Sequence, residues 1–190
     1  MCIRDRTHPD LSRVEVFTSH EALLLNVESA LTRLDGGSGE WFDTSAHMLW
    51  IGERTRQLDG APVEFMKGIK NPIGVKCGPT MTADDLLPLI DALNPDNVSG
   101  RLTLIGRFGH DKVGERLPKL MREVKASGRK VIWSIDPMHG NTLKAGNGYK
   151  TRPFDRILGE VRTFIDVAEA EGVHPGGVQL GQALTQLGLD

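Results

Sequence analysis

The sequence has 190 residues, of which 39% are hydrophobic and 25% charged, and its formal net charge is −2. Such a chain is long enough to bury a substantial core, and its composition excludes a disordered protein. The nearly balanced charge gives no reason to expect binding to nucleic acid or to a membrane surface, and no apolar run is long enough to span a bilayer. Two cysteines, Cys2 and Cys77, cannot form a disulfide framework, so we expect a reducing compartment, the cytoplasm.

The amino-terminal part predicts one helix. Residues 1–6 have no capping or periodic pattern, and we interpret them as a non-native leader. Residues 18–21 have the spacing of a capping box, which predicts that a helix begins there. Apolar residues then recur at helical spacing. They are Leu23, Val27, Ala30, Leu31 and Leu34. A glycine-rich loop at residues 35–39 ends this helix.

The rest of the chain alternates short apolar runs with amphipathic segments. The runs predict strands buried on both faces, as a parallel sheet requires. They lie at residues 46–51, 73–75, 102–105 and 131–135, with a weaker one at 177–180. Helices are predicted at residues 82–93, in a segment that ends near Ala126, and at residues 154–171. Pro88 and Pro118 are expected in the first turn of their helices.

The last of these helices shows the clearest apolar stripe. Its inward-facing residues are predicted to be Ile157, Leu158, Val161, Phe164, Ile165 and Ala168.

A strand and a helix recurring about every 30 residues indicate an α/β fold built from βα units. An open doubly wound sheet and a closed (β/α)₈ barrel both have this period. The chain holds four or five units, and a barrel typically needs about 250 residues, so a barrel would be present here as a partial one. We place this partial barrel domain at residues 7–181 and a divergent tail at residues 182–190.

Basic side chains follow successive predicted strands. Arg54, Lys76, Arg107 and His139 stand at the carboxyl ends of four runs, separated by 22, 31 and 32 residues. Both α/β architectures place their sites at this edge of the sheet. Several cations gathered there need an anion to neutralise them, and a ligand with phosphate and carboxylate groups is the simplest one. The alternative for each cation taken alone is a solvated or ion-paired residue.

Other residues near these strand ends have two interpretations each. His139 is either a loop histidine bonded to backbone or a metal ligand or acid–base group. Lys150 and Arg152 could hold a second phosphate or only solvate a loop. Cys77 is interpreted as a small buried residue at a strand end. Core packing is expected for Trp41, whereas Trp50 is close enough to residues 53 and 54 to wall a ligand pocket.

Five long motifs in a fixed order resemble the class II (plant-type) 3-deoxy-D-arabino-heptulosonate 7-phosphate synthases, over residues 17–180. The motifs are residues 50–59, 71–80, 100–107, 136–142 and 174–177. This resemblance implies a (β/α)₈ barrel enzyme of the shikimate pathway that leads to chorismate and the aromatic amino acids. It condenses phosphoenolpyruvate with erythrose 4-phosphate, releases phosphate and requires a divalent metal such as Mn or Co. The resemblance also implies that the full-length protein is a homo-oligomer.

The resemblance assigns roles to particular residues. Phosphoenolpyruvate would contact Glu53, Arg54, Lys76 and Arg107, and Lys76 and His139 would be the catalytic residues. His139 would also be a metal ligand. Apart from the resemblance, we expect Lys150 and Arg152 to bind erythrose 4-phosphate or the released phosphate.

The metal site of that family is only partly represented in this sequence. The family uses a cysteine, a histidine, a glutamate and an aspartate. Cys77 does not correspond to that cysteine, and Gly181 stands where the glutamate should follow the His-Pro-Gly-Gly motif. The aspartate would lie beyond the last residue. One imidazole does not hold a divalent ion usefully, so we expect this fragment to be inactive alone.

Two other functions stay open at this point. One is a non-catalytic remnant of the fold that binds an anion or a partner. The other is an aldolase-type barrel enzyme in which Lys76 forms a Schiff base.

Overall fold

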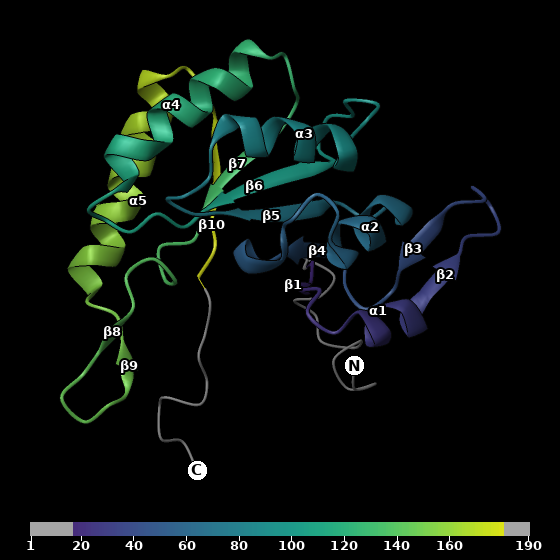
Figure 1. Ribbon diagram of the computed structural model, residues 1–190, viewed down its shortest axis with the longest axis horizontal. Coiled ribbons are helices and arrows are strands. Elements are labelled where there is room, and N and C mark those ends of the chain that lie inside the picture. The colour runs from purple at the N-terminus through teal and green to yellow at the C-terminus, as the bar shows by residue number, and fades with distance from the viewer. Residues whose placement is uncertain (1–16, 181–190) are drawn as a thin grey trace, which may run out of the picture.

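The computed structural model describes residues 17–180 (Figure 1). The predicted leader at residues 1–6, the tail at residues 182–190, Cys2 and Gly181 lie outside the described residues. No helix within residues 17–180 is both long and apolar enough to cross a bilayer.

A six-stranded parallel sheet forms the centre of the molecule (Figure 1). Its strands are β1 (Ser19–Glu21), β4 (Met48–Ile51), β5 (Ile73–Cys77), β6 (Leu102–Gly106), β7 (Ile132–Ile135) and β10 (Pro175–Val178). Each strand pairs with the next strand of the sheet along the chain, in the order β1-β4-β5-β6-β7-β10. The predicted strands are confirmed, except that the last one lies two residues earlier.

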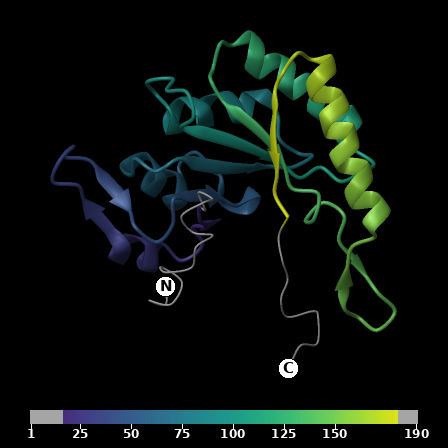
Figure 2. The same cartoon turned by 180° about the vertical axis from the view of Figure 1, so that it is seen from behind.

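A helix follows each strand from β4 to β7. These helices are α2 (Ala61–Gly68), α3 (Ala83–Leu93), α4 (Val113–Ala126) and α5 (Phe154–Ala170). Figures 1 and 2 show α3, α4 and α5 together along one face of the sheet. A doubly wound sheet reverses its strand order and carries helices on both faces, whereas a barrel adds strands in one direction. The order observed here therefore confirms the predicted partial (β/α) barrel.

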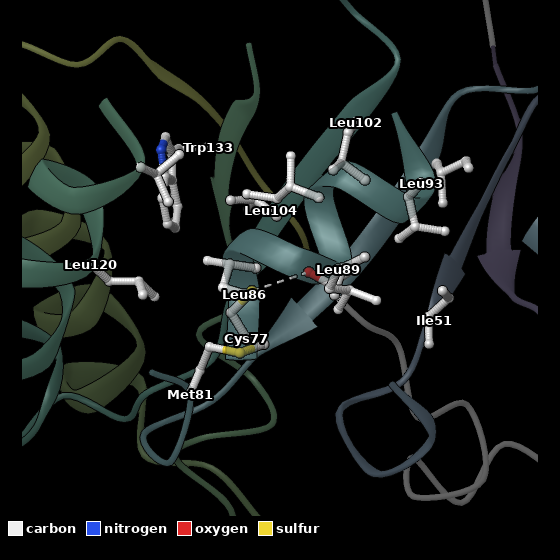
Figure 3. Packing of buried hydrophobic residues seen from close by; sticks show 14 of the residues in the cluster. Ile51, Cys77, Met81, Leu86, Leu89, Leu93, Leu102, Leu104, Leu120 and Trp133 are labelled. Atoms are coloured by element: carbon white, nitrogen blue, oxygen red, sulfur yellow. Dashed lines mark hydrogen bonds between the residues drawn. The ribbon is translucent and has the colours of Figure 1, made fainter. Parts of the chain in front are cut away.

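The core lies between the sheet and these helices. Leu102, Leu104 and Trp133 point from the sheet toward α3 and α4, as Figure 3 shows. Leu86 on α3 and Leu120 on α4 pack against them from the helical side. This packing holds the sheet against the helices, and the basic residues lie at the carboxyl ends of its strands.

The predicted amino-terminal helix is wrong in its boundaries. Residues 19–21 of the supposed capping box form β1, because their backbone pairs with β4. Beyond β1, the Ala22 N–H donates to the Trp50 carbonyl at 3.0 Å. Helix α1 covers only Leu25–Leu31, and the chain continues into an antiparallel pair, β2 (Thr32–Leu34) and β3 (Trp41–Asp43). Val27 is 49% exposed, so the apolar stripe does not face the core.

The two prolines lie farther into their helices than predicted. Helix α3 begins at Ala83 because Thr82 and Asp85 form a reciprocal capping box, which places Pro88 inside the helix. Pro118 is likewise inside α4. The buried apolar faces of both helices compensate for the backbone hydrogen bond that a proline cannot donate.

Two predictions of burial are also wrong. Trp41 is 50% exposed because it lies on the peripheral β2–β3 pair rather than in the main sheet. Ile165 on α5 is 36% exposed, while Glu160 on the same helix is completely buried. The buried stripe of α5 is therefore rotated relative to the apolar periodicity, since it includes a carboxylate.

Two small elements stand near the carboxyl ends of the strands. A 3₁₀ helix, η3 (Glu53–Thr55), follows β4. A hairpin of β8 (Leu143–Lys144) and β9 (Lys150–Thr151) lies between β7 and α5 and projects from the body of the molecule in Figure 1. These elements bring Glu53 and Lys150 to the edge of the sheet that carries the basic residues.

Candidate anion-binding site

A cavity of about 740 Å³ opens at the carboxyl ends of the strands. Every residue to which the sequence assigns a binding or catalytic role lines it. They are Glu53, Arg54, Lys76, Arg107, His139, Lys150 and Arg152. Trp50 lines the same cavity, as its position before η3 predicts. The parallel register brings these side chains together from strands far apart in the sequence.

Lys76 is the buried cation of the cavity. It is the fourth residue of β5 and is only 5% exposed. Its Nζ donates hydrogen bonds to Asp136 Oδ2 and to Gln179 Oε1, both at 2.5 Å. Nζ also lies 5.3 Å from the centre of the Trp50 ring, within the range of a cation–π contact. The ammonium group is therefore held in one place by three neighbours.

Asp136, directly after β7, links Lys76 to His139. Its Oδ2 lies 2.6 Å from His139 Nδ1, and its Oδ1 accepts the backbone N–H groups of Met138 and His139 at 3.0 and 3.2 Å. Burial alone would raise the pKa of Asp136, but the His139 hydrogen bond and the Lys76 charge outweigh it and lower the pKa to about 2. The ionised carboxylate can only accept, so Nδ1 carries the proton and Nε2 is the ring nitrogen left for a proton or a metal.

Arg107 follows β6 and is held by two neighbouring loops. Its Nη1 forms an ion pair with Glu53 Oε2 of η3, and its Nη2 donates to the His139 carbonyl at 3.1 Å. Gly78 lies directly against the Glu53 carboxylate, since a Cβ atom at this position would overlap it. A glycine at residue 78 is thus required for Glu53 to reach Arg107.

Basic groups outnumber carboxylates around the cavity. Five lysine and arginine side chains line it against three carboxylates, which leaves an excess of two positive charges. The carboxylates of Asp136 and Glu53 already pair with Lys76 and Arg107. Arg54 and Lys150 are exposed, and Arg152 Nε donates to the Met138 carbonyl at 2.7 Å. Two carboxylates of the protein therefore supply part of the negative charge that the sequence predicted for a ligand. The excess positive charge lies at the mouth of the cavity, where Arg54 and Lys150 are exposed.

Sequence reasoning missed two residues that contact Lys76. Asp136 belongs to a recognised motif and directly follows an apolar run, so its position could have indicated a site residue. Gln179 gave no such signal, because it contacts Lys76 across 103 residues of sequence. Both contacts depend on β5, β7 and β10 lying close together in the sheet.

The described residues do not form a metal site. Within residues 17–180, no three histidine, cysteine, aspartate or glutamate side chains are grouped so that they could hold an ion. His139 Nε2 offers one ligand, and Cys77 Sγ donates to the Val75 carbonyl inside the core. A divalent ion therefore does not fit the side chains of this part of the chain alone.

Cys77 is buried at the end of β5, beside Met81 and Leu86 in Figure 3, as the sequence predicted for a small strand-end residue. Burial raises the pKa of its thiol to about 12, because the apolar surroundings disfavour the thiolate. The neighbouring charge of Lys76 does not reverse this effect.

We therefore predict that the Cys77 thiol does not react while the protein is folded. In a Cys2→Ser variant, a thiol-specific disulfide reagent at pH 8 should release no chromophore until denaturant is added, and then one equivalent. Stoichiometric labelling of the native variant within minutes would contradict the buried, protonated thiol.

The fold and the cavity define the class: a (β/α)-barrel protein with a cationic pocket at the carboxyl edge of its sheet. Residues 1–186 match the model of the Class-II DAHP synthetase family, so the chain belongs to this family. It is 53% identical over 171 residues to a phospho-2-dehydro-3-deoxyheptonate aldolase of Streptomyces coelicolor, which covers 90% of this chain and 38% of that protein. It is also 53% identical over 178 residues to a probable chloroplastic enzyme of the same name from Catharanthus roseus, covering 94% and 36%. The chain thus spans less than two-fifths of the length of these relatives.

Proposed function

We propose that this chain carries the phosphoenolpyruvate-binding part of a 3-deoxy-7-phosphoheptulonate synthase. This transferase joins phosphoenolpyruvate to erythrose 4-phosphate and releases phosphate, at the start of the shikimate route to chorismate and the aromatic amino acids. One observation carries the proposal: the cations at the carboxyl ends of β4, β5 and β6 line a single cavity in a member of this family.

The charges of the cavity suit phosphoenolpyruvate, which carries a phosphate and a carboxylate on a small frame. Arg54 and Arg107 can bind such groups through paired N–H donors, and Lys76 supplies a compact charge. Glu53 and Asp136 hold Arg107 and Lys76 in place before the ligand arrives, so little ordering is needed on binding. Fixing both anionic ends would orient the enol carbon for attack on the sugar aldehyde.

The second phosphate has a separate place in this proposal. Lys150 and Arg152 lie on or beside β9 and line the same cavity. Arg152 is anchored to the Met138 carbonyl, so its guanidinium stays near the loop of His139. These two cations would bind the phosphate of erythrose 4-phosphate or the phosphate released from phosphoenolpyruvate.

The divalent metal of the family would meet His139 in this chain. Its Nε2 is available because Asp136 holds the opposite ring nitrogen. No complete ligand set stands among residues 17–180, so we expect this chain to bind phosphoenolpyruvate without turning it over. The proposal also includes a reducing compartment such as the cytoplasm, which suits the free thiol of Cys77, and a homo-oligomeric full-length protein.

Arg107 provides a direct test of the proposed binding site. Replacing it by alanine should weaken phosphoenolpyruvate binding at least tenfold, about the effect of losing one charge-assisted contact worth roughly 1.5–3 kcal/mol. Calorimetric titration of the 190-residue chain measures this affinity. Arg116→Ala, which removes an exposed arginine of α4, is the matched control and should change nothing. Equal affinities for wild type and Arg107→Ala would count against the assigned site.

The lack of a metal-ligand cluster among the described residues favours a second candidate, a non-catalytic remnant that binds an anion or a partner. A chimera separates the two. Residues 17–180 replace the matching segment of the Streptomyces coelicolor relative, and turnover is measured with a divalent metal. We expect an active chimera. A folded chimera that binds phosphoenolpyruvate and stays inactive would establish the remnant instead.

The Schiff-base alternative makes a contrasting prediction at Lys76. Its Nζ already donates to Asp136 and Gln179, which ties the amine to two acceptors rather than leaving it free to attack a carbonyl. Incubation with pyruvate and borohydride should therefore give no adduct detectable by mass spectrometry. A covalent adduct mapped to Lys76 would overturn the synthase proposal.

A further inference from the structure

We propose that Glu160, on α5, is a positioning residue of the cavity. Its carboxylate ties the loop after β6 to the loop after β7, and thereby sets where Arg107 and His139 stand. This inference rests on the proposed function, because those two residues matter only if the cavity binds an anionic substrate.

Glu160 fixes the loop that carries Arg107. The side chain is completely buried. Its Oε1 accepts the backbone N–H groups of Phe108 and Gly109, both at 2.9 Å. These are the two residues directly after Arg107, so the backbone cannot shift there without breaking a hydrogen bond inside the protein.

The other oxygen of Glu160 fixes the loop that carries His139. Oε2 accepts a hydrogen bond from Asn141 Nδ2 at 2.6 Å, and the same Nδ2 donates to the Pro137 carbonyl at 2.8 Å. Asn141 Oδ1 in turn accepts the backbone N–H of His110 at 3.1 Å. Asn141 therefore closes the turn around His139 and also bonds back to the first loop.

The two loops also touch each other directly. A Cβ atom on Gly140 would lie 2.9 Å from the Cα atom of Gly109, so only a glycine allows this approach. Gly109 itself has a φ of 89°, a conformation that L side chains rarely adopt. A hydrogen bond from Arg107 Nη2 to the His139 carbonyl also joins the two loops. A displacement of either loop thus changes the distance between the two cavity residues.

The carboxylate at residue 160 is explained by its hydrogen bonds to these loops and not by the packing of α5. Phe164 and Ala168 already anchor the helix through apolar burial. Glu160 forms no ion pair with the described residues, although burial of its carboxyl group is unfavourable and raises its pKa. The two carboxylate oxygens of Glu160 accept hydrogen bonds from three donors of the two loops. An apolar side chain at this position would leave two backbone N–H groups unpaired.

Two substitutions test the link. Glu160→Gln keeps an oxygen for Phe108 and Gly109 but turns an NH₂ group toward Asn141, so only the loop after β7 is released. Glu160→Ala releases both loops. Each variant should bind phosphoenolpyruvate about tenfold more weakly, the lower end of the effect of losing an outer-shell contact. The alanine variant alone should also show faster hydrogen exchange at the amides of Phe108 and Gly109.

Controls separate positioning from loss of stability. Glu169→Gln removes an exposed carboxylate of the same helix and should leave the affinity unchanged. Phe164→Leu truncates a buried apolar side chain of the same helix. It is expected to lower the melting temperature and to leave the affinity unchanged. If Glu160 acts through Arg107, adding Glu160→Ala to Arg107→Ala should cause little further loss of affinity.

The outcomes distinguish the inference from the proposed function. Wild-type affinity in folded Glu160→Gln and Glu160→Ala would overturn the positioning role. Additive losses in the double variant would overturn its action through Arg107. If Glu160→Ala does not fold, Glu160→Gln decides, and failure of both to fold would make Glu160 a structural residue. Failure of the wild-type chain to bind phosphoenolpyruvate would instead reject the proposed function, while hydrogen exchange would still report whether Glu160 joins the loops.

Discussion

One carboxylate oxygen of Asp136 contacts both Lys76 and His139, and the arrangement of the cavity depends on that shared contact. Lys76 lies near the carboxyl end of β5, and His139 follows β7. Strand β6 lies between these two strands in the sheet. Two groups on such distant strands keep a fixed relation only if something bridges them, and the ionised carboxylate does so with a pKa of about 2. The same oxygen fixes the proton on His139 Nδ1. Removal of this bridge would leave the buried ammonium with Gln179 as its one hydrogen-bond acceptor among residues 17–180.

The cavity combines cations that are already paired with cations that are exposed. Lys76 and Arg107 lie deeper and have carboxylate partners, which offset the cost of bringing charges out of water. Arg54 and Lys150 stand at the mouth in contact with solvent. An arriving anion would first meet the exposed positive charge and then reach groups whose positions are already set. This division suits a small ligand with two anionic ends.

Glu160 has a structural role similar to that of Asp136, but its hydrogen-bond donors are two backbone N–H groups and the Asn141 amide rather than charged side chains. Each is a buried carboxylate that joins two segments through separate hydrogen bonds. Asp136 connects the side chains of the cavity, and Glu160 connects the loops on which two of them stand. The parallel strands bring every group to the same edge of the sheet. The hydrogen bonds of these two carboxylates then hold individual side chains and loops in place. Glycines at residues 78, 109 and 140 make room for the contacts.

The sequence by itself determined the strands from β4 to β7, the three long helices and the cations at the strand ends, because apolar periodicity and the alternation of strands with helices are visible in short stretches of sequence. Membership of the family followed from the same motifs. Only the tertiary structure decided that residues 19–21 pair as a strand, since β1 depends on β4 rather than on its own capping pattern. It also decided which partners hold the cations: Asp136 and Gln179 meet Lys76 across 60 and 103 residues of sequence. Contacts of that range, like the burial of Glu160 on an otherwise apolar face, exist only once the sheet has brought distant segments together.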